Sequence, residues 1–301
     1  MTSVRIELPY PVDLVRTIGP LVRGRSDPTT RVAPGTVLRA VRTPDGPATV
    51  RLTQRGPSVV EAEATGPGGE RALAEVAPGL VGADDDPAAF PAECPDRHPA
   101  VEDAWRRHHD VLLTRADPFP VLVAAVLEQK VTGVEAREAW RALVRWNAEP
   151  APGDDGLLLP PDATRVAEVP SWVLARAGVV GRRASTLREI ARHAARIARL
   201  PAAPIPEATT WLGALPGVGP WTIAEVARLA LGDADAVSVG DFHLPHVVAW
   251  TLAGEPRATD ARMLELLAPY AGHRGRVQRL LEATGATAPR FGPRVEPRAI
   301  V

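Results

Sequence analysis

The sequence predicts an α+β protein in which a small N-terminal antiparallel β-sheet with a helix precedes an all-α body. Two observations predict this class. Apolar and polar residues alternate in three stretches between residues 31 and 66, and the turn signals APG, TPDGP and GP separate them, as in an antiparallel meander. After residue 100 the apolar residues recur with a period of about 3.6, which is typical of amphipathic helices.

The N-terminal part, residues 1–90, is predicted to form the sheet domain. Residues 7–24 read as an extended start followed by a short helix, and about four strands follow. Residues 82–99 are rich in acidic residues and prolines and lack periodicity, which predicts a linker. Residues 91–301 are predicted to form the all-α domain.

The helical region ends in a Pro/Arg-rich tail, residues 288–301, which is predicted to be loose. Capping signals support the helices: Thr259 and Asp260 precede one apolar run, and Gly178 follows another. The predicted helices span residues 100–113, 118–131, 133–146, 171–178, 181–200, 209–215, 220–231, 241–252, 259–270 and 273–285.

Composition excludes several classes of protein. Cys94 is the only cysteine, which excludes an intramolecular disulfide framework and an all-cysteine zinc or iron–sulfur site. No apolar stretch approaches the roughly 20 residues that span a bilayer, and the N-terminus has no secretory signal; we expect a cytoplasmic protein. The net charge is −1, but residues 171–301 hold 16 arginines against 11 acidic residues, which indicates either an anionic partner there or ordinary surface solvation.

The densest local signal is WLGALPGVGPWTIAEVA, residues 211–227. Gly217 and Gly219 flank one small residue and allow positive φ and a close backbone approach, and Pro220 suits the first position of a new helix. Backbone N–H groups of such a turn, together with the helix dipole, form an anion site without any charged side chain. The alternative is an ordinary corner between two helices.

Asp241 lies twenty residues after Trp221, in the loop 236–246, after a short Gly-containing apolar stretch. An aspartate before an apolar helix is commonly a purely structural N-cap, and that interpretation stays open on this segment alone.

Together, LPGVGPWTIAEVA (215–227) and VSVGDFHLPHVV (237–248) resemble the hairpin and the Gly/Pro-rich loop with aspartate of the helix-hairpin-helix DNA glycosylase superfamily. The resemblance is strongest to the 3-methyladenine DNA glycosylase II branch, which also has an N-terminal sheet domain before an all-α body. LEQKV (127–131) resembles that branch's helix with a glutamine and a wedge residue. The fold that the resemblance implies is thus an N-terminal sheet and a helix-hairpin-helix body.

The resemblance implies a role for each matching position. Asp241 would be the catalytic carboxylate, and an extruded base would meet a pocket at Trp221, Glu225 and Leu281. Double-stranded DNA with a damaged base is the implied partner, and a monomer suffices for it. DNA contacts are implied for Gln129, Lys130, Leu215, Gly217, Val218, Gly219 and Thr222.

The implied activity is monofunctional excision of alkylated, 3-methyladenine-type bases in base excision repair. Bifunctional members place a lysine where Trp221 stands, and Lys130 is the only lysine of the chain, so strand cleavage is not expected. No cofactor is required by this chemistry, and no iron–sulfur cluster is expected. Backbone carbonyls of Gly213, Leu215 and Val218 can hold a structural Na⁺ or K⁺, as hairpins of the family often do. The expected location is the cytoplasm, at the nucleoid.

Several positions depart from the branch and keep alternatives open. Glu225 and Leu281 stand where aromatic residues are expected, and Lys130 replaces the usual apolar wedge. The alternative functions are a glycosylase for oxidised or mismatched bases and a non-catalytic DNA-binding protein. Trp221 can stack on the base or be a core tryptophan. The arginines of residues 182–199 can be a solvated helix face or follow phosphates.

Overall fold

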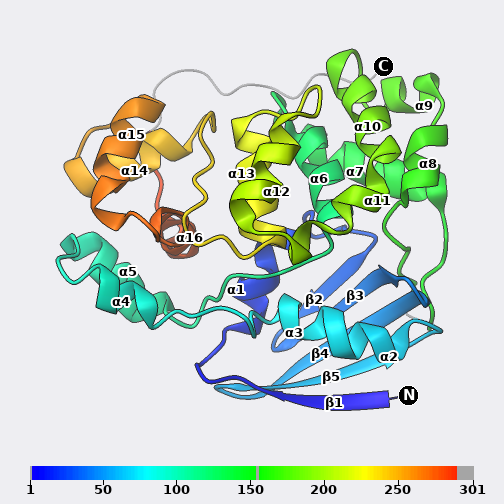
Figure 1. Ribbon diagram of the computed structural model, residues 1–301, viewed down its shortest axis with the longest axis horizontal. Helices are drawn as coiled ribbons and strands as arrows, with labels where there is room; N and C mark the ends of the chain where they lie inside the picture. Colours follow the sequence, from blue (N-terminus) through cyan, green and yellow to red (C-terminus); the bar gives the residue numbers. More distant parts are fainter. Residues whose placement is uncertain (1, 154–155, 290–301) are drawn as a thin grey trace.

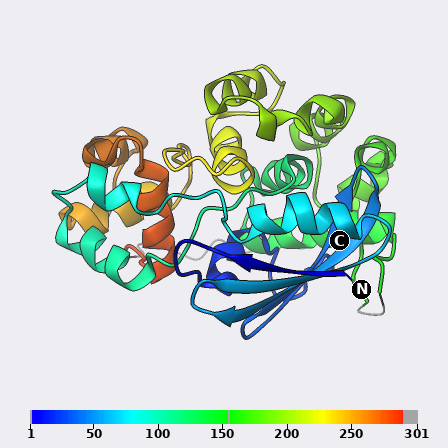
Figure 2. The same cartoon turned by 60° about the horizontal axis from the view of Figure 1, so that its bottom comes forward.

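The computed structural model describes residues 2–153 and 156–289, so most of the tail 288–301 lies outside the described residues. It contains one antiparallel sheet with strand order β1-β5-β4-β3-β2 (Figures 1 and 2). The predicted α+β class is therefore confirmed. The sheet has five strands rather than about four, because the extended N-terminus pairs with the last strand, Ile6 opposite Val60. The strands are β1 (Thr2–Glu7), β2 (Thr30–Ala33), β3 (Thr36–Thr43), β4 (Gly46–Gly56) and β5 (Val59–Thr65).

The predicted alternation within the strands corresponds to burial on one face of the sheet. Ala48, Val50 and Leu52 of β4 are fully buried, and Arg51 between them is partly exposed. Thr49 is an exception, since it is also buried and its hydroxyl donates to the carbonyl of Pro152 (2.6 Å). Short helices follow the first and the last strands. They are α1 (Leu14–Ile18), η1 (Gly19–Leu21), α2 (Gly69–Arg71), η2 (Ala72–Val76) and α3 (Ala77–Leu80).

The helical body surrounds α6 (Pro118–Glu128), which is buried from Pro118 to Leu127. Its other helices are α4 (Ala89–Glu93), α5 (Pro99–His108), α7 (Gly133–Asn147), α8 (Ala163–Glu168), α9 (Ser171–Arg176), α10 (Arg182–Arg192), α11 (Ala194–Ile197), η3 (Leu200–Ala202), α12 (Ile205–Gly213), α13 (Pro220–Ala230), α14 (Leu244–Ala253), α15 (Asp260–Leu267), η4 (Ala268–Tyr270) and α16 (Arg274–Thr284). None of the described helices has both the length and the apolar character that crossing a bilayer requires.

Several helix boundaries differ from the predictions: the helix predicted over 100–113 ends at His108, and the one predicted over 209–215 begins at Ile205. The segment 181–200 breaks at His193, where α10 ends. The helix predicted from Asp241 begins at Leu244. Helix α8 was not predicted, because it has only six residues, too few to show a helical period.

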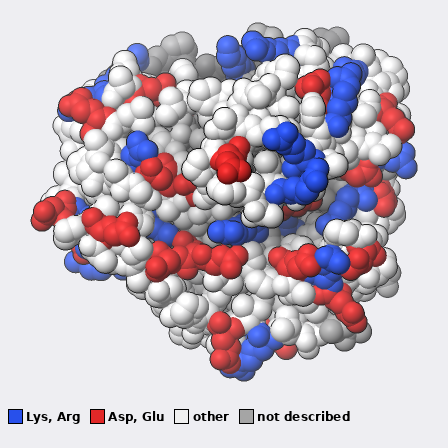
Figure 3. Space-filling model, viewed as in Figure 1, with Lys and Arg blue, Asp and Glu red and all other residues white. Residues whose placement is uncertain are grey.

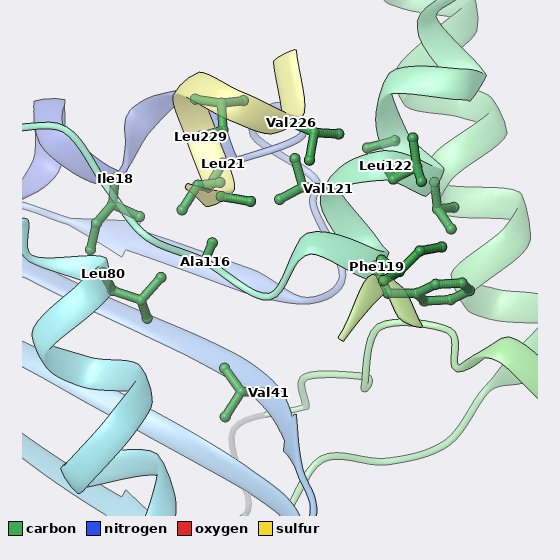
Figure 4. Packing of buried hydrophobic residues seen from close by; sticks show 14 of the residues in the cluster. Ile18, Leu21, Val41, Leu80, Ala116, Phe119, Val121, Leu122, Val226 and Leu229 are labelled. Atoms are coloured by element: carbon green, nitrogen blue, oxygen red, sulfur yellow. The ribbon is translucent and has the colours of Figure 1, made fainter. Parts of the chain in front are cut away.

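The main hydrophobic core joins the sheet to the helical body. Phe119, Val121 and Leu122 of α6 lie between the sheet residue Val41 and α13 (Figure 4). Because α6 packs against α7, α10 and α13, this core fixes the end of α6 beside the start of α13.

A second core lies at the other end of the molecule, where α4 and α5 pack beside α14, α15 and α16 (Figure 1). Phe90, in the predicted linker, is fully buried there. The predicted linker, residues 82–99, does connect the sheet to the second core, but it contains helix α4 and packs there through Phe90, which its acidic residues and prolines do not indicate. The two cores do not follow the predicted division into residues 1–90 and 91–301, which stays a prediction.

Candidate active site

The connection between α12 and α13 is a tight hairpin that only glycine permits at one position. Gly217 has φ +88°, and a Cβ on it would lie 1.8 Å from Oγ1 of the buried Thr186. Gly219 differs from the prediction: its backbone is extended (φ −103°), and a Cβ there would meet nothing within 4 Å. Gly217 is thus required by the fold, whereas Gly219 faces open space.

The hairpin leaves backbone groups available to a ligand. Within the described part of the chain, the N–H groups of Gly217, Gly219 and Trp221 donate no hydrogen bond. They lie at the N-terminal end of α13, whose dipole favours an anion. In the same part of the chain, the carbonyls of Gly213 and Val218 accept no hydrogen bond, whereas the carbonyl of Leu215, the third predicted cation ligand, accepts the N–H of Val218 (3.1 Å).

Both carboxylate oxygens of Asp241 are held in place. Oδ1 accepts the backbone N–H groups of His243 (2.7 Å) and Leu244 (2.8 Å) at the start of α14. Oδ2 accepts the indole Nε1–H of Trp221 (3.3 Å). Asp241 itself is half-buried. The carboxylate is therefore fixed between the first turn of α13 and the first turn of α14 and remains within reach of solvent.

Gln129 ties the end of α6 to the hairpin. Its Nε2 donates to the carbonyl of Gly217 (2.9 Å) and to Oγ1 of Thr222 (2.9 Å). Lys130 follows with φ +55° and an exposed side chain. A positive φ is unusual for a residue with a Cβ and places Lys130 at the tip of a sharp turn.

The structure thus brings Gln129, the hairpin, Trp221 and Asp241 into one continuous set of contacts. Figure 1 shows the end of α6, the hairpin between α12 and α13, and the segment before α14 on the same upper side of the molecule. Of the other predicted residues, Leu215 and Val218 are buried inside the hairpin. Leu281 is only 1% exposed and packs in the second core.

Glu225, one helical turn after Trp221, is buried in a polar network rather than in an apolar pocket. It forms a two-pronged ion pair with Arg228 (2.9 and 3.2 Å) and accepts Oγ–H of Ser238 (2.6 Å). Ser238 in turn accepts from Gln278 (3.0 Å). The loop that carries Asp241 is thereby joined to α13 and α16.

The buried charges of this network shift the pKa values of its arginines. Burial lowers the pKa of Arg228, but the carboxylates of Glu225 and Glu282 more than offset that effect, so its pKa lies above the usual value. Burial lowers the pKa of Arg279 to about 10. Sequence reasoning singled out Glu225 as a pocket residue but did not predict its network with Ser238 and Gln278, because residues 13 and 40 positions apart give no local signal.

Comparison with known proteins identifies the fold. No protein-family model matches the sequence, and no curated protein sequence matches it either. Among solved structures, the fold is similar to that of a 3-methyladenine DNA glycosylase from Archaeoglobus fulgidus, with a TM-score of 0.77 and 18% identity over 92% of this chain and 97% of that chain.

A second similar structure is the 8-oxoguanine glycosylase/lyase of Clostridium acetobutylicum, with a TM-score of 0.71 and 14% identity over 94% of this chain and 96% of that chain. The 3-methyladenine DNA glycosylase of Schizosaccharomyces pombe bound to abasic DNA has a TM-score of 0.51 and 16% identity, over 65% of this chain and 97% of that chain. At these identities the likeness shows a shared fold, and the chain has the fold of these DNA glycosylases.

Proposed function

We propose that this protein is a monofunctional DNA glycosylase that hydrolyses the N-glycosidic bond of alkylated, 3-methyladenine-type bases. The observation that carries the proposal is the fixed carboxylate of Asp241, held by two backbone N–H groups and by Trp221 beside a glycine hairpin. A purely structural N-cap needs only the backbone contacts. The additional indole contact connects the carboxylate to the hairpin, where a DNA backbone would be bound.

The hairpin would hold the phosphates next to the lesion. Its free N–H groups, together with the dipole of α13, supply hydrogen-bond donors without the flexibility of long side chains. The target nucleotide would leave the duplex at a cost of roughly a few kcal/mol, which damaged pairs reduce. Gln129 and the exposed Lys130 lie beside the hairpin, where they would fill the emptied space in the stack.

Asp241 would act on the extruded nucleotide. As the bond from C1′ to the base nitrogen breaks, positive charge develops on the deoxyribose, and a prepositioned carboxylate stabilises that charge. The same carboxylate can orient or deprotonate the attacking water. Alkylated purines already carry positive charge, so the departing base needs little help from an acid.

Trp221 supports both the alkylated substrate and the absence of strand cleavage. The Nε1–H group lies in the plane of the ring, so donating it to Asp241 leaves the ring face available to a cationic base. Trp221 offers no amine for a Schiff base, and the only lysine, Lys130, lies after α6. The proposal requires no cofactor. A Na⁺ or K⁺ on the carbonyls of Gly213, Leu215 and Val218 would only stabilise the hairpin.

The proposed role would place the protein with DNA in the cytoplasm, acting as a monomer.

The test compares wild type with Asp241→Asn on duplexes carrying 3-methyladenine or 7-methylguanine. Released base is measured, and strand breaks are counted before and after hot alkali. Asp162→Asn is the matched control, because Asp162 caps α8 in the same way through the N–H of Arg165 (2.8 Å).

We expect release by wild type and by the control, a loss of at least about 100-fold in Asp241→Asn, and breaks only after alkali. Undiminished release by Asp241→Asn would overturn the catalytic assignment. Breaks without alkali would overturn the monofunctional assignment. If wild type binds the duplexes but releases neither base, the alkylated substrate is wrong, and oxidised or mismatched bases become the next substrates to assay.

A further inference from the structure

A groove beside the hairpin is lined by three arginines. It has a volume of about 260 Å³ and joins α10 to the turn that begins α13. Its lining residues are Arg182, Ser185, Thr186, Arg188, Glu189, Arg192, Pro216 and Gly217. The groove therefore shares Gly217 with the proposed phosphate site of the hairpin.

The arginines of the groove come from one helix. Arg182, Arg188 and Arg192 belong to α10: Arg188 and Arg192 are four residues apart and share one face, whereas Arg182, at the start of the helix, lies about 120° around the axis from Arg188. Along the helix axis they cover roughly 15 Å at 1.5 Å per residue. One strand of a duplex rises about 3.4 Å per phosphate, so this length corresponds to about four phosphates.

The positive charge of the groove is only partly neutralised. Glu189 pairs with Arg192 (2.7 Å) and contacts His193 (3.1 Å). Arg188 donates to the neutral Oγ of Ser171 (2.9 Å). Arg182 is exposed, and its guanidinium forms no ion pair or hydrogen bond with the described residues. The residues that line the groove thus include three arginines and one carboxylate, that of Glu189.

The start of α10 departs from the usual distribution of charge on a helix. Its first turn has no acidic residue and begins with two arginines, although the positive end of the helix dipole disfavours cations there. Arg183 has a structural role, because it donates to the carbonyl of Leu127 (3.0 Å). Arg182 has no such role. Within the described part of the chain, its charge is unfavourable for the helix and unused by the fold, which is typical of a ligand-binding position.

Helix α10 contacts the hairpin through Thr186. Thr186 of α10 donates to the carbonyl of Pro216 (3.3 Å), and its Oγ1 fills the space above Gly217. Figure 3 shows several basic side chains over the upper right of the face drawn there, where Figure 1 places α10. A strand held at the hairpin would therefore continue past the three arginines of α10.

We propose that the α10 groove binds the sugar–phosphate backbone of the same duplex, a few nucleotides away from the lesion. This inference rests on the proposed DNA binding but not on the proposed chemistry. It extends the phosphate contacts from backbone N–H groups at the hairpin to arginine side chains, which contact phosphates without reading the base sequence.

The test measures the salt dependence of binding to an undamaged duplex. The groove variant combines Arg182→Gln, Arg188→Gln and Arg192→Gln. The control combines Arg5→Gln, Arg55→Gln and Arg71→Gln, which removes the same charge from the sheet side of the molecule. Each phosphate contact contributes about 0.9 to the slope of log K against log salt. We expect the groove variant to lose about two to three from that slope and the control to keep the wild-type slope.

The single variant Arg182→Gln controls for misfolding. Within the described residues, the guanidinium of Arg182 has no partner that the substitution would remove. This variant should reduce the slope by about one and leave the melting temperature unchanged or slightly raised, because it removes a cation from the positive end of the helix dipole. Equal slopes for wild type and the groove variant would overturn the inference and identify a solvated helix face. Excision assays separate the two proposals. If the groove variant keeps the wild-type slope and excision is intact, only the proposed groove contact is overturned. If wild type binds DNA but does not excise the base, only the proposed glycosylase activity is overturned.

Discussion

Asp241 shows how one side chain can be both a helix cap and a reactive group. Its Oδ1 is occupied by two backbone N–H groups, whereas Oδ2 receives a single indole donor. An oxygen with one donor keeps a lone pair for the sugar or for water. Trp221 is thus a positioning residue for the carboxylate in addition to its proposed contact with the base.

We predict that Trp221→Phe slows base release by about 10- to 100-fold, because a hydrogen bond to a charged group contributes roughly 1.5–3 kcal/mol. The phenyl ring keeps a smaller stacking face, so the variant removes the donor while retaining part of the proposed contact with the base. The measurement is single-turnover release with saturating protein, and Trp250→Phe on the exposed side of α14 is the control. A rate within twofold of wild type would show that the indole N–H does not position Asp241.

At this scale the sequence singled out the residues that lie in short, recognisable motifs. Asp241 and Gly217 were identified in this way, although their contacts with Trp221 and Thr186 lie 20 and 31 residues away and were not predicted. The environment of Glu225 was not found. Its partner Arg228 is near in sequence, but Ser238 and Gln278 come from a loop and a helix that only the fold brings together.

At the scale of elements, the hairpin joins two helices by a turn in which the two glycines serve different purposes. Gly217 satisfies a backbone angle and a close contact with Thr186, and Gly219 leaves the surface open. The motif GVG alone does not distinguish these purposes, since both positions permit positive φ. In the structure the two glycines differ in φ and in the space around a Cβ, so substitutions at them should affect stability differently.

We predict that Gly217→Ala lowers the free energy of unfolding by about 2–5 kcal/mol, because a left-handed backbone and a crowded Cβ are both unfavourable. Gly219→Ala should change it by less than about 0.5 kcal/mol, as at an unconstrained surface position. Urea denaturation measures both. If the two variants unfold at the same urea concentration, the turn does not depend on the angle at Gly217.

Element boundaries followed the sequence where a cap or an apolar period was strong. The capping box of Thr132 and Glu135 starts α7, and its predicted first residue, Gly133, is confirmed. The start of α14 was placed three residues early, because Asp241 looked like the first residue of the helix. Its side chain caps the helix from outside, while Phe242 stays 77% exposed.

At the scale of the whole molecule, the segment 82–99 links the sheet to the second core and is anchored at several points. Phe90 packs against Trp105 with ring centroids 5.3 Å apart. Asp85 pairs with Arg276 of α16 at 2.5 Å, and both side chains are nearly inaccessible to solvent. A buried ion pair cannot be inferred from one acidic run, because the same residues are usually solvated.

Removal of Asp85 from this buried pair should destabilise the fold. Asp85→Ala leaves the guanidinium of Arg276 buried without its carboxylate, and the loss of one partner of a buried pair costs about 3–5 kcal/mol. Asp84→Ala is the matched control, because Asp84 is exposed and 3.8 Å from Arg115. It should cost less than about 0.5 kcal/mol.

The double variant Asp85→Ala with Arg276→Met removes the uncompensated charge and should be more stable than Asp85→Ala alone, because an apolar side chain of similar size tolerates burial. Both variants lose the same bond from the backbone N–H of Leu113 to Asp85 (2.9 Å), so that loss cancels in the comparison. The measurement is the free energy of unfolding in a double-mutant cycle. Equal stability of the single and double variants would mean that the charge of Arg276 finds other compensation, and that segment 82–99 is held mainly by Phe90.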